Sequence, residues 1–104
     1  MTKDERLKIY DEATKLWGLV AQYDQCIEEM AELTVAINKY KRKVLYGEYE
    51  NKDIDQSVVE EIADVKLCLE QIEYFFKDYD IDKVVEKKVQ KLEDEIEYMK
   101  SKKK

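Results

Sequence analysis

The sequence predicts an all-α protein, an antiparallel bundle of about four helices that forms a single domain over residues 1–104. The 104 residues contain no Pro and only two Gly, so few positions interrupt a helix. Apolar residues also recur at spacings of three and four along successive segments, which is the helical period. A chain of this length builds only one small core, and we expect dimerisation to complete it.

The first two helices are predicted over residues 4–17 and 19–46. Gly18 lies between them, where glycine commonly ends a helix. The second helix has an apolar stripe made of Val20, Tyr23, Ile27, Met30, Ile37 and Val44. Residues 47–55 are polar and without periodicity, which predicts a connection.

The third helix is predicted to begin at Ser57, because Ser57 and Glu60 have the spacing of a capping box. Its apolar stripe consists of Val58, Ile62, Val65, Leu69, Ile72 and Phe76. Residues 78–80 predict a turn, and Asp82 is the expected N-cap of the fourth helix.

The fourth helix is apolar along one narrow seam, and residues 100–104 are predicted to be a basic, frayed tail. The seam consists of Val85, Val89, Leu92, Ile96 and Met99. So narrow a seam indicates packing against another molecule, and we expect a homodimer or homotetramer.

Composition excludes several classes of function. The chain has no His, which excludes Ser-His-Asp and Cys-His catalysis and His-bound zinc. Cys26 and Cys68 are isolated, so we expect small buried side chains in a protein of the reducing cytoplasm. The net charge of −6 argues against a nucleic acid polymer as partner, and no apolar run approaches the length of a membrane span.

Two acidic clusters are the sequence feature that indicates a chemical function. The second helix contains Glu29 and Glu32, and the third contains Glu61 and Asp64, each pair three residues apart. Residues at this spacing share a helix face, so their like charges repel. Both clusters flank an apolar stripe, where unpaired carboxylates are costly to desolvate. Two such helices packed antiparallel predict a cage for Mg²⁺, which prefers oxygen ligands; the alternative is acidic side chains on a solvated face.

The blocks IEEMAEL at residues 27–33 and EEIADV at residues 60–65 resemble the MazG-like branch of the all-α nucleoside triphosphate pyrophosphohydrolases. Trp17, Gly18 and Gln22 extend the resemblance, which covers roughly residues 15–76. It implies hydrolysis of a nucleoside triphosphate, NTP or dNTP, to the monophosphate and pyrophosphate, by attack of water on the α-phosphorus. It also implies a helical fold completed by dimerisation.

The resemblance implies roles for individual residues. The metal-binding carboxylates, for Mg²⁺ or alternatively Mn²⁺, correspond to Glu29, Glu32, Glu61 and Asp64. Glu28 corresponds to a further acid that binds a metal or orients water. Lys88 and Lys91 correspond to phosphate contacts, and Trp17 and Gln22 lie near the start of the metal-binding helix, where Trp17 could stack on a nucleobase.

Other interpretations remain open at this point. Lys88 and Lys91 also fit a solvated pair, and Trp17 also fits a core position. The alternative function is a catalytically weak or inactive helical module that binds a nucleotide or a protein partner. A plain structural bundle is a third.

Overall fold

The structure is a computed structural model, and it describes residues 1–47 and 52–103. Four α-helices follow one another along the chain: α1 (Lys3–Trp17), α2 (Leu19–Tyr40), α3 (Lys52–Phe75) and α4 (Ile81–Lys102). A five-residue π-helical turn, η1 (Lys41–Leu45), extends α2. Within the described residues there is no strand, so the predicted all-α class is confirmed.

The ends of α1 follow from its capping residues. The Thr2 hydroxyl accepts a hydrogen bond from the Glu5 amide (3.1 Å), and the Glu5 carboxylate accepts one from the Thr2 amide (3.2 Å). This reciprocal pair is a capping box. At the other end Gly18 has φ +93° and donates its N–H to the Thr14 carbonyl at 2.8 Å. Gly18 therefore ends α1, as the sequence predicts.

Replacing Gly18 with Ala is expected to destabilise the fold by about 1–3 kcal/mol. The backbone at Gly18 has φ +93° and ψ 159°, a region that essentially only glycine adopts, while a Cβ there would meet no atom within 4 Å. The cost is therefore backbone strain and not a clash. Urea unfolding of both proteins measures the difference, and an unchanged midpoint would contradict the described turn.

The turn after α2 is wider than an α-helical turn. The Tyr46 amide donates to the Lys41 carbonyl five residues earlier, at 3.0 Å. Gly47 follows, where an added Cβ would lie 2.7 Å from the Lys43 carbonyl oxygen. The absence of a side chain at Gly47 therefore permits the chain to turn back this closely.

The predicted start of α3 is wrong, because the helix begins at Lys52 and Ser57 lies inside it. Asp53 and Asp55 stand in the first turn, where acidic side chains stabilise the positive end of the helix dipole. The described part of the predicted connection is therefore partly helical, and its residues 48–51 lie outside the described part of the chain.

The turn before α4 is confirmed, but its N-cap is Asp80 and not Asp82. The Asp80 carboxylate accepts a hydrogen bond from the Lys83 amide at 3.0 Å. Asp82 lies in the first helical turn. The helix continues through Lys102, well into the expected frayed tail.

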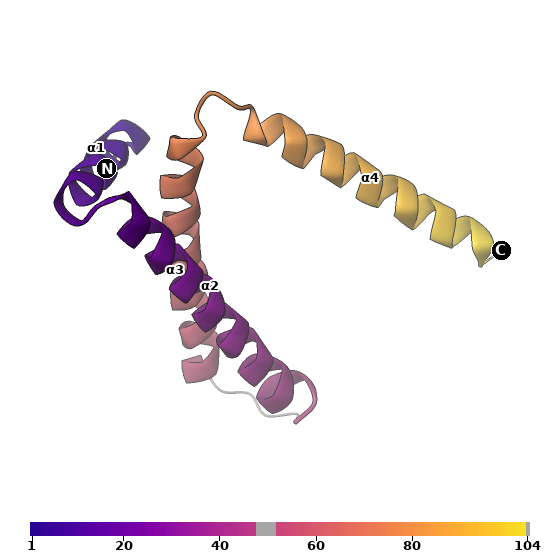
Figure 1. Cartoon of the computed structure of the whole chain (residues 1–104). Coiled ribbons are helices and arrows are strands. Elements are labelled where there is room, and N and C mark those ends of the chain that lie inside the picture. Colours follow the sequence, from indigo (N-terminus) through magenta and orange to yellow (C-terminus); the bar gives the residue numbers. More distant parts are fainter. Residues whose placement is uncertain (48–51, 104) are drawn as a thin grey trace.

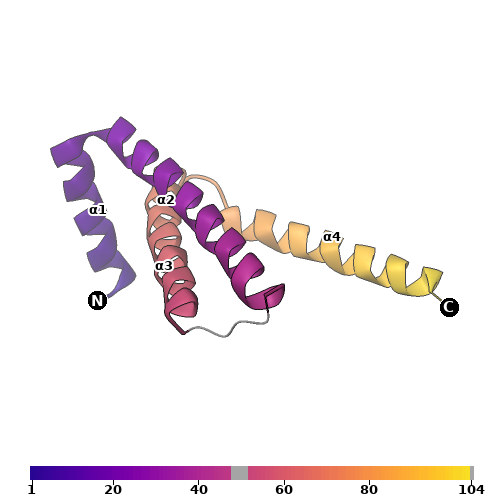
Figure 2. The same ribbon diagram turned by 90° about the horizontal axis from the view of Figure 1, so that it is seen from below.

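α2 and α3 form the central antiparallel pair, and α1 lies against them (Figures 1 and 2). Between α2 and α3 the Gln71 amide donates to the Gln22 side-chain oxygen at 2.9 Å, and both glutamines are buried. One turn further along the pair, Cys26 and Cys68 are buried and close enough for each thiol to shift the pKa of the other. Glutamines and small side chains thus occupy the centre of this interface.

Hydrogen bonds to one acid, Glu70 of α3, join α1 to α3. Glu70 receives both Nε (2.7 Å) and Nη2 (3.1 Å) of Arg6, and the Tyr10 hydroxyl donates to it at 2.9 Å. These bonds hold the pKa of the Glu70 carboxyl below its usual value, Arg6 being the main cause. Tyr10 is buried and completes the α1 contact.

α4 extends away from the other three helices in both views (Figures 1 and 2). The radius of gyration is 18.1 Å, against about 13 Å for a compact domain of this length. No residue of α4 is buried. Nor does any helix within the described ranges combine the length and apolar character required to cross a membrane.

Candidate metal centre

Three carboxylates from two helices converge at the α2–α3 interface. Glu29 and Glu32 lie one turn apart on α2, and Glu61 faces them from α3. One carboxylate oxygen from each lies within 4.8 Å of the other two. The antiparallel packing of α2 and α3 therefore brings together three of the four predicted metal ligands.

Two of these acids are half-buried and incompletely hydrogen-bonded. The Oε2 atoms of Glu29 and Glu61 are inaccessible to solvent and have no hydrogen-bond partner within the described residues. The other oxygen of Glu29 accepts a bond from the Gln25 amide at 2.7 Å. A buried carboxylate oxygen without a donor is costly, and a hard divalent cation offsets that cost. The donor set fits Mg²⁺ or Mn²⁺.

Nearby negative charges raise the pKa of the third acid, Glu32. The charge of Glu29 is the main cause that raises the pKa of Glu32, followed by desolvation and the charge of Glu61. The proton is thus held more tightly than by an ordinary glutamate, because ionising Glu32 adds a third negative charge to the cluster.

This shift predicts how the stability of the metal-free protein depends on pH. A raised folded pKa means that the folded state binds more protons, so the Glu32 contribution falls as pH rises from 4.5 through the raised value. Glu70 acts oppositely: its lowered pKa gives stability that is complete above 4.5 and lost as pH falls through the folded value. These two groups together favour maximal stability near pH 4.5.

Thermal unfolding in chelator between about pH 3 and about pH 8 measures this dependence. Glu32→Gln is expected to flatten the decline on the high-pH side only, and Glu70→Gln the decline on the low-pH side only. Identical profiles for the wild type and Glu32→Gln would show that the carboxylates do not interact.

The remaining predicted acids lie outside the three-carboxylate group. Glu28 is exposed on α2, and Asp64 is exposed three residues after Glu61 on α3. Asp64 is the next acid along α3, but it is not among the three acids that converge.

The predicted substrate contacts are dispersed in the single chain. Trp17 is 67% exposed at the end of α1, and Gln22 is buried and bonded to Gln71. Lys88 and Lys91 are exposed on α4, which extends away from the carboxylates (Figure 1). None of these four side chains is brought to the carboxylate group within one chain.

The two thiols lie near this group, since the charge of Glu29 contributes to the raised pKa of each. Cys26 and Cys68 are 1% and 3% exposed, which confirms them as buried side chains. Burial is the main cause that raises the pKa of both, that of Cys68 to about 12. Both thiols therefore stay protonated at neutral pH and do not add to the negative charge of the carboxylates.

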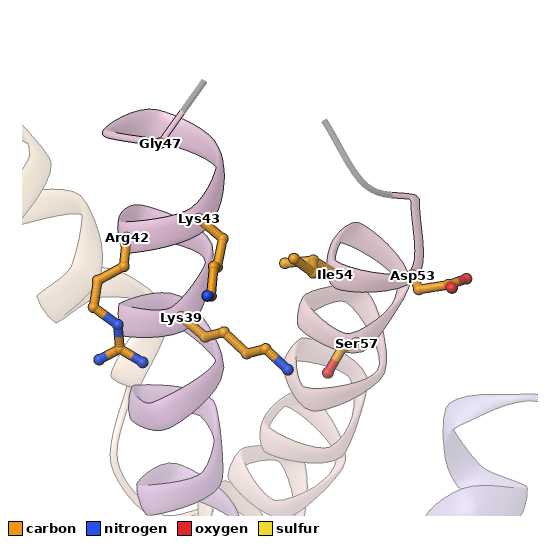
Figure 3. Close-up of a pocket in the computed structure, with 7 residues that line it drawn as sticks. All are labelled: Lys39, Arg42, Lys43, Gly47, Asp53, Ile54 and Ser57. Atoms are coloured by element: carbon orange, nitrogen blue, oxygen red, sulfur yellow. The ribbon is translucent and has the colours of Figure 1, made fainter. Parts of the chain in front are cut away.

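A basic cavity of about 700 Å³ lies further along the same pair of helices. In Figure 3, Lys39 and Lys43 point from α2 and η1 into the space facing Ile54 and Ser57 of α3, whereas Asp53 points away from it. Neither lysine forms an ion pair with an acid of the described residues. Lys39, Arg42 and Lys43 thus gather three positive side chains at this cavity, with Asp53 at its margin.

The cavity and the carboxylates lie on one side of the helix pair. Lys39 follows Glu32 by seven residues, two turns and about 10 Å along the axis, and Ser57 precedes Glu61 by one turn. Residues at these spacings share a helix face. The sequence interpretation missed this basic region, although the run KYKRK at residues 39–43, which begins in the last turn of α2, was a signal for it.

The arrangement thus joins a carboxylate cluster to a cationic cavity along one helix pair, a combination suited to a cation and a phosphorylated ligand. Comparison of this chain with protein-family models, with curated proteins and with solved structures finds no match.

Proposed function

We propose that this protein is a divalent-cation-dependent nucleoside triphosphate pyrophosphohydrolase, which releases pyrophosphate and the nucleoside monophosphate. The buried, unpartnered Oε2 atoms of Glu29 and Glu61 carry the proposal, because they need a positive partner. The MazG-like blocks around these residues supply the reaction type. The basic cavity supports a polyphosphate ligand.

In this proposal Glu29, Glu32 and Glu61 hold Mg²⁺ or Mn²⁺, and Asp64 is the nearest further ligand on α3. Such an ion supplies, when bound, positive charge that neutralises phosphate oxygens and lowers the pKa of water. Glu28 is exposed beside the group and orients the attacking water. Lys39 and Lys43 bind the phosphates that extend away from the carboxylates.

The direct test is a pyrophosphate-release assay with NTPs and dNTPs, run with Mg²⁺, with Mn²⁺ and with chelator. Release of pyrophosphate that requires the ion is expected for at least one nucleotide. The absence of turnover across the panel would reject the enzymatic proposal. Activity that survives replacement of both Glu32 and Asp64 would reject the assigned site.

The second candidate is a nucleotide-binding regulatory module without turnover. The exposure of Asp64 and the distance of Lys88 and Lys91 from the carboxylates favour it, because fewer groups then surround a reacting phosphate. Nucleotide and metal would raise the melting temperature of this module while no pyrophosphate appears.

Reversing the charge of Lys39 tests the phosphate-binding cavity. Lys39→Glu is expected to raise KM for the nucleotide about tenfold, because it replaces an attractive phosphate contact with a repulsive one. Steady-state kinetics at two salt concentrations measure the effect, which weakens at high salt.

Lys8→Glu is the matched control, since Lys8 is exposed on α1 and the substitution changes the net charge equally. An equal rise in KM for both variants would indicate a general charge effect. Lys91→Glu distinguishes the cavity from the family-based expectation: a larger rise for Lys91→Glu than for Lys39→Glu would place the phosphates at α4 instead.

A further inference from the structure

α4 presents an apolar seam that no other part of the described chain covers. Its 22 residues extend away from the remaining helices, and none of them is buried (Figures 1 and 2). The five seam residues are 46–57% exposed: Val85, Val89, Leu92, Ile96 and Met99. Most of the stability of a helix in a protein comes from packing of its apolar face, so α4 gains from a partner.

The seam has the period of a coiled coil. Its members are spaced by four, three, four and three residues, an average of 3.5 over two heptads. Val89 and Ile96 then occupy a positions, whereas Leu92 stands at a central d position between Val85 and Met99. β-Branched side chains at a with Leu at d favour two parallel strands over higher oligomers.

We propose that two copies of this chain associate through α4 as a parallel, in-register coiled coil. In that arrangement each g position faces the e position five residues further along the other helix. Lys88 then faces Glu93 of the other copy, and Glu95 faces Lys100. By symmetry each attraction occurs twice, and no pair of like charges faces across these positions.

The charges favour the parallel pair over the antiparallel alternatives. Two antiparallel registers keep four of the five seam residues in contact. The first places Glu93 opposite Glu93 and Glu95 opposite Glu95. The second places Glu86 opposite Glu93 but also Lys88 opposite Glu95, so its repulsive and attractive pairs cancel, whereas the parallel pair has attractive pairs only. Like charges across a helix interface repel, so the flanking residues select the parallel pair.

This assignment is separate from the carboxylate site, because the seam contains none of the acids of α2 or α3. In the parallel pair the two α3–α4 junctions lie at the same end of the coil, so the two α1–α3 units are held side by side. The association stands or fails independently of nucleotide hydrolysis.

Sedimentation of the full chain over a range of concentrations tests the association. The wild type is expected to dimerise, and Leu92→Lys at the centre of the seam is expected to be monomeric at concentrations where the wild type is dimeric. Val84→Lys is the matched control, because Val84 is 51% exposed on α4 outside the seam. Circular dichroism confirms that each variant stays helical.

A monomeric wild type would overturn the proposal, and would indicate that the seam folds onto its own chain. Equal dissociation by Leu92→Lys and Val84→Lys would also overturn it, since the seam would then have no special part in the contact.

Orientation is tested with Glu95 and Lys100, both exposed on α4. Each reversal alone, Glu95→Lys or Lys100→Glu, is expected to raise the dimer Kd about tenfold at low salt, because two attractive pairs become repulsive. The double variant exchanges the charges and is expected to restore the wild-type Kd. In both antiparallel registers Glu95 and Lys100 do not face each other, so a double variant as weak as the singles would overturn the parallel arrangement.

Discussion

Glu61→Gln is expected to raise the melting temperature of the metal-free protein by a few degrees while reducing kcat/KM by at least about 100-fold. The substitution removes one of three carboxylates whose oxygens lie within 4.8 Å, and so relieves repulsion that raises the pKa of Glu32. It also removes a proposed metal ligand. Stability and activity therefore move in opposite directions.

Thermal unfolding with and without Mg²⁺ measures the first effect. In the wild type an ion at about 100 times its Kd stabilises the fold by about 2.7 kcal/mol, and this gain is expected to disappear in Glu61→Gln. Glu60→Gln is the matched control, since Glu60 is the exposed neighbour with the same charge. Equal behaviour of the two variants would show that Glu61 has no special role.

Gln71→Met is expected to destabilise the fold by about 2 kcal/mol. Gln71 donates the bond that satisfies the buried Gln22 oxygen, and Met keeps the length of the side chain while removing the donor. The stability loss arises from the acceptor left without a partner. Replacing both glutamines with Met removes donor and acceptor together and is expected to restore most of the loss.

Urea unfolding of the two single variants and the double variant measures the coupling. Gln56→Met is the control, because Gln56 is exposed on α3. A double variant as unstable as the sum of the two singles would show that the glutamines contribute independently.

The sequence was sufficient to predict the helical class, the end of α1 at Gly18 and the turn before α4. Gly18 and the turn at residues 78–80 interrupt the apolar periodicity, so they could be recognised. The start of α3 could not, since Ser57 and Glu60 have capping spacing but lie inside a helix that begins at Lys52. A capping motif is a local pattern, and the acidic first turn with Asp53 and Asp55 extends the helix beyond it.

The inward face of α2 was predicted less well. Val20 and Ile27 belong to the predicted stripe but are 72% and 62% exposed, whereas Cys26 and Ala36 are buried. Small side chains allow α2 and α3 to approach closely, and the large apolar residues then lie outside the contact. Periodicity identifies an apolar face but does not show which neighbouring helix covers it.

The candidate site was predictable where it depends on spacing within a helix. Glu29 and Glu32 share a face by their spacing, and an antiparallel neighbour brings Glu61 to them. The exposure of Asp64 depends on the rotation of α3 about its axis, and the cavity at Lys39 depends on how η1 turns. Neither is a property of a local sequence pattern.

The burial of Cys26 on α2 and Cys68 on α3 makes the two thiols a probe of how often these helices separate. Both thiols are nearly inaccessible and protonated at neutral pH, so an alkylating reagent can modify them only after α2 and α3 separate. The alkylation rate therefore measures how often this helix pair opens, with no label introduced. A cation that binds across Glu29 and Glu61 joins the same two helices and would slow that reaction.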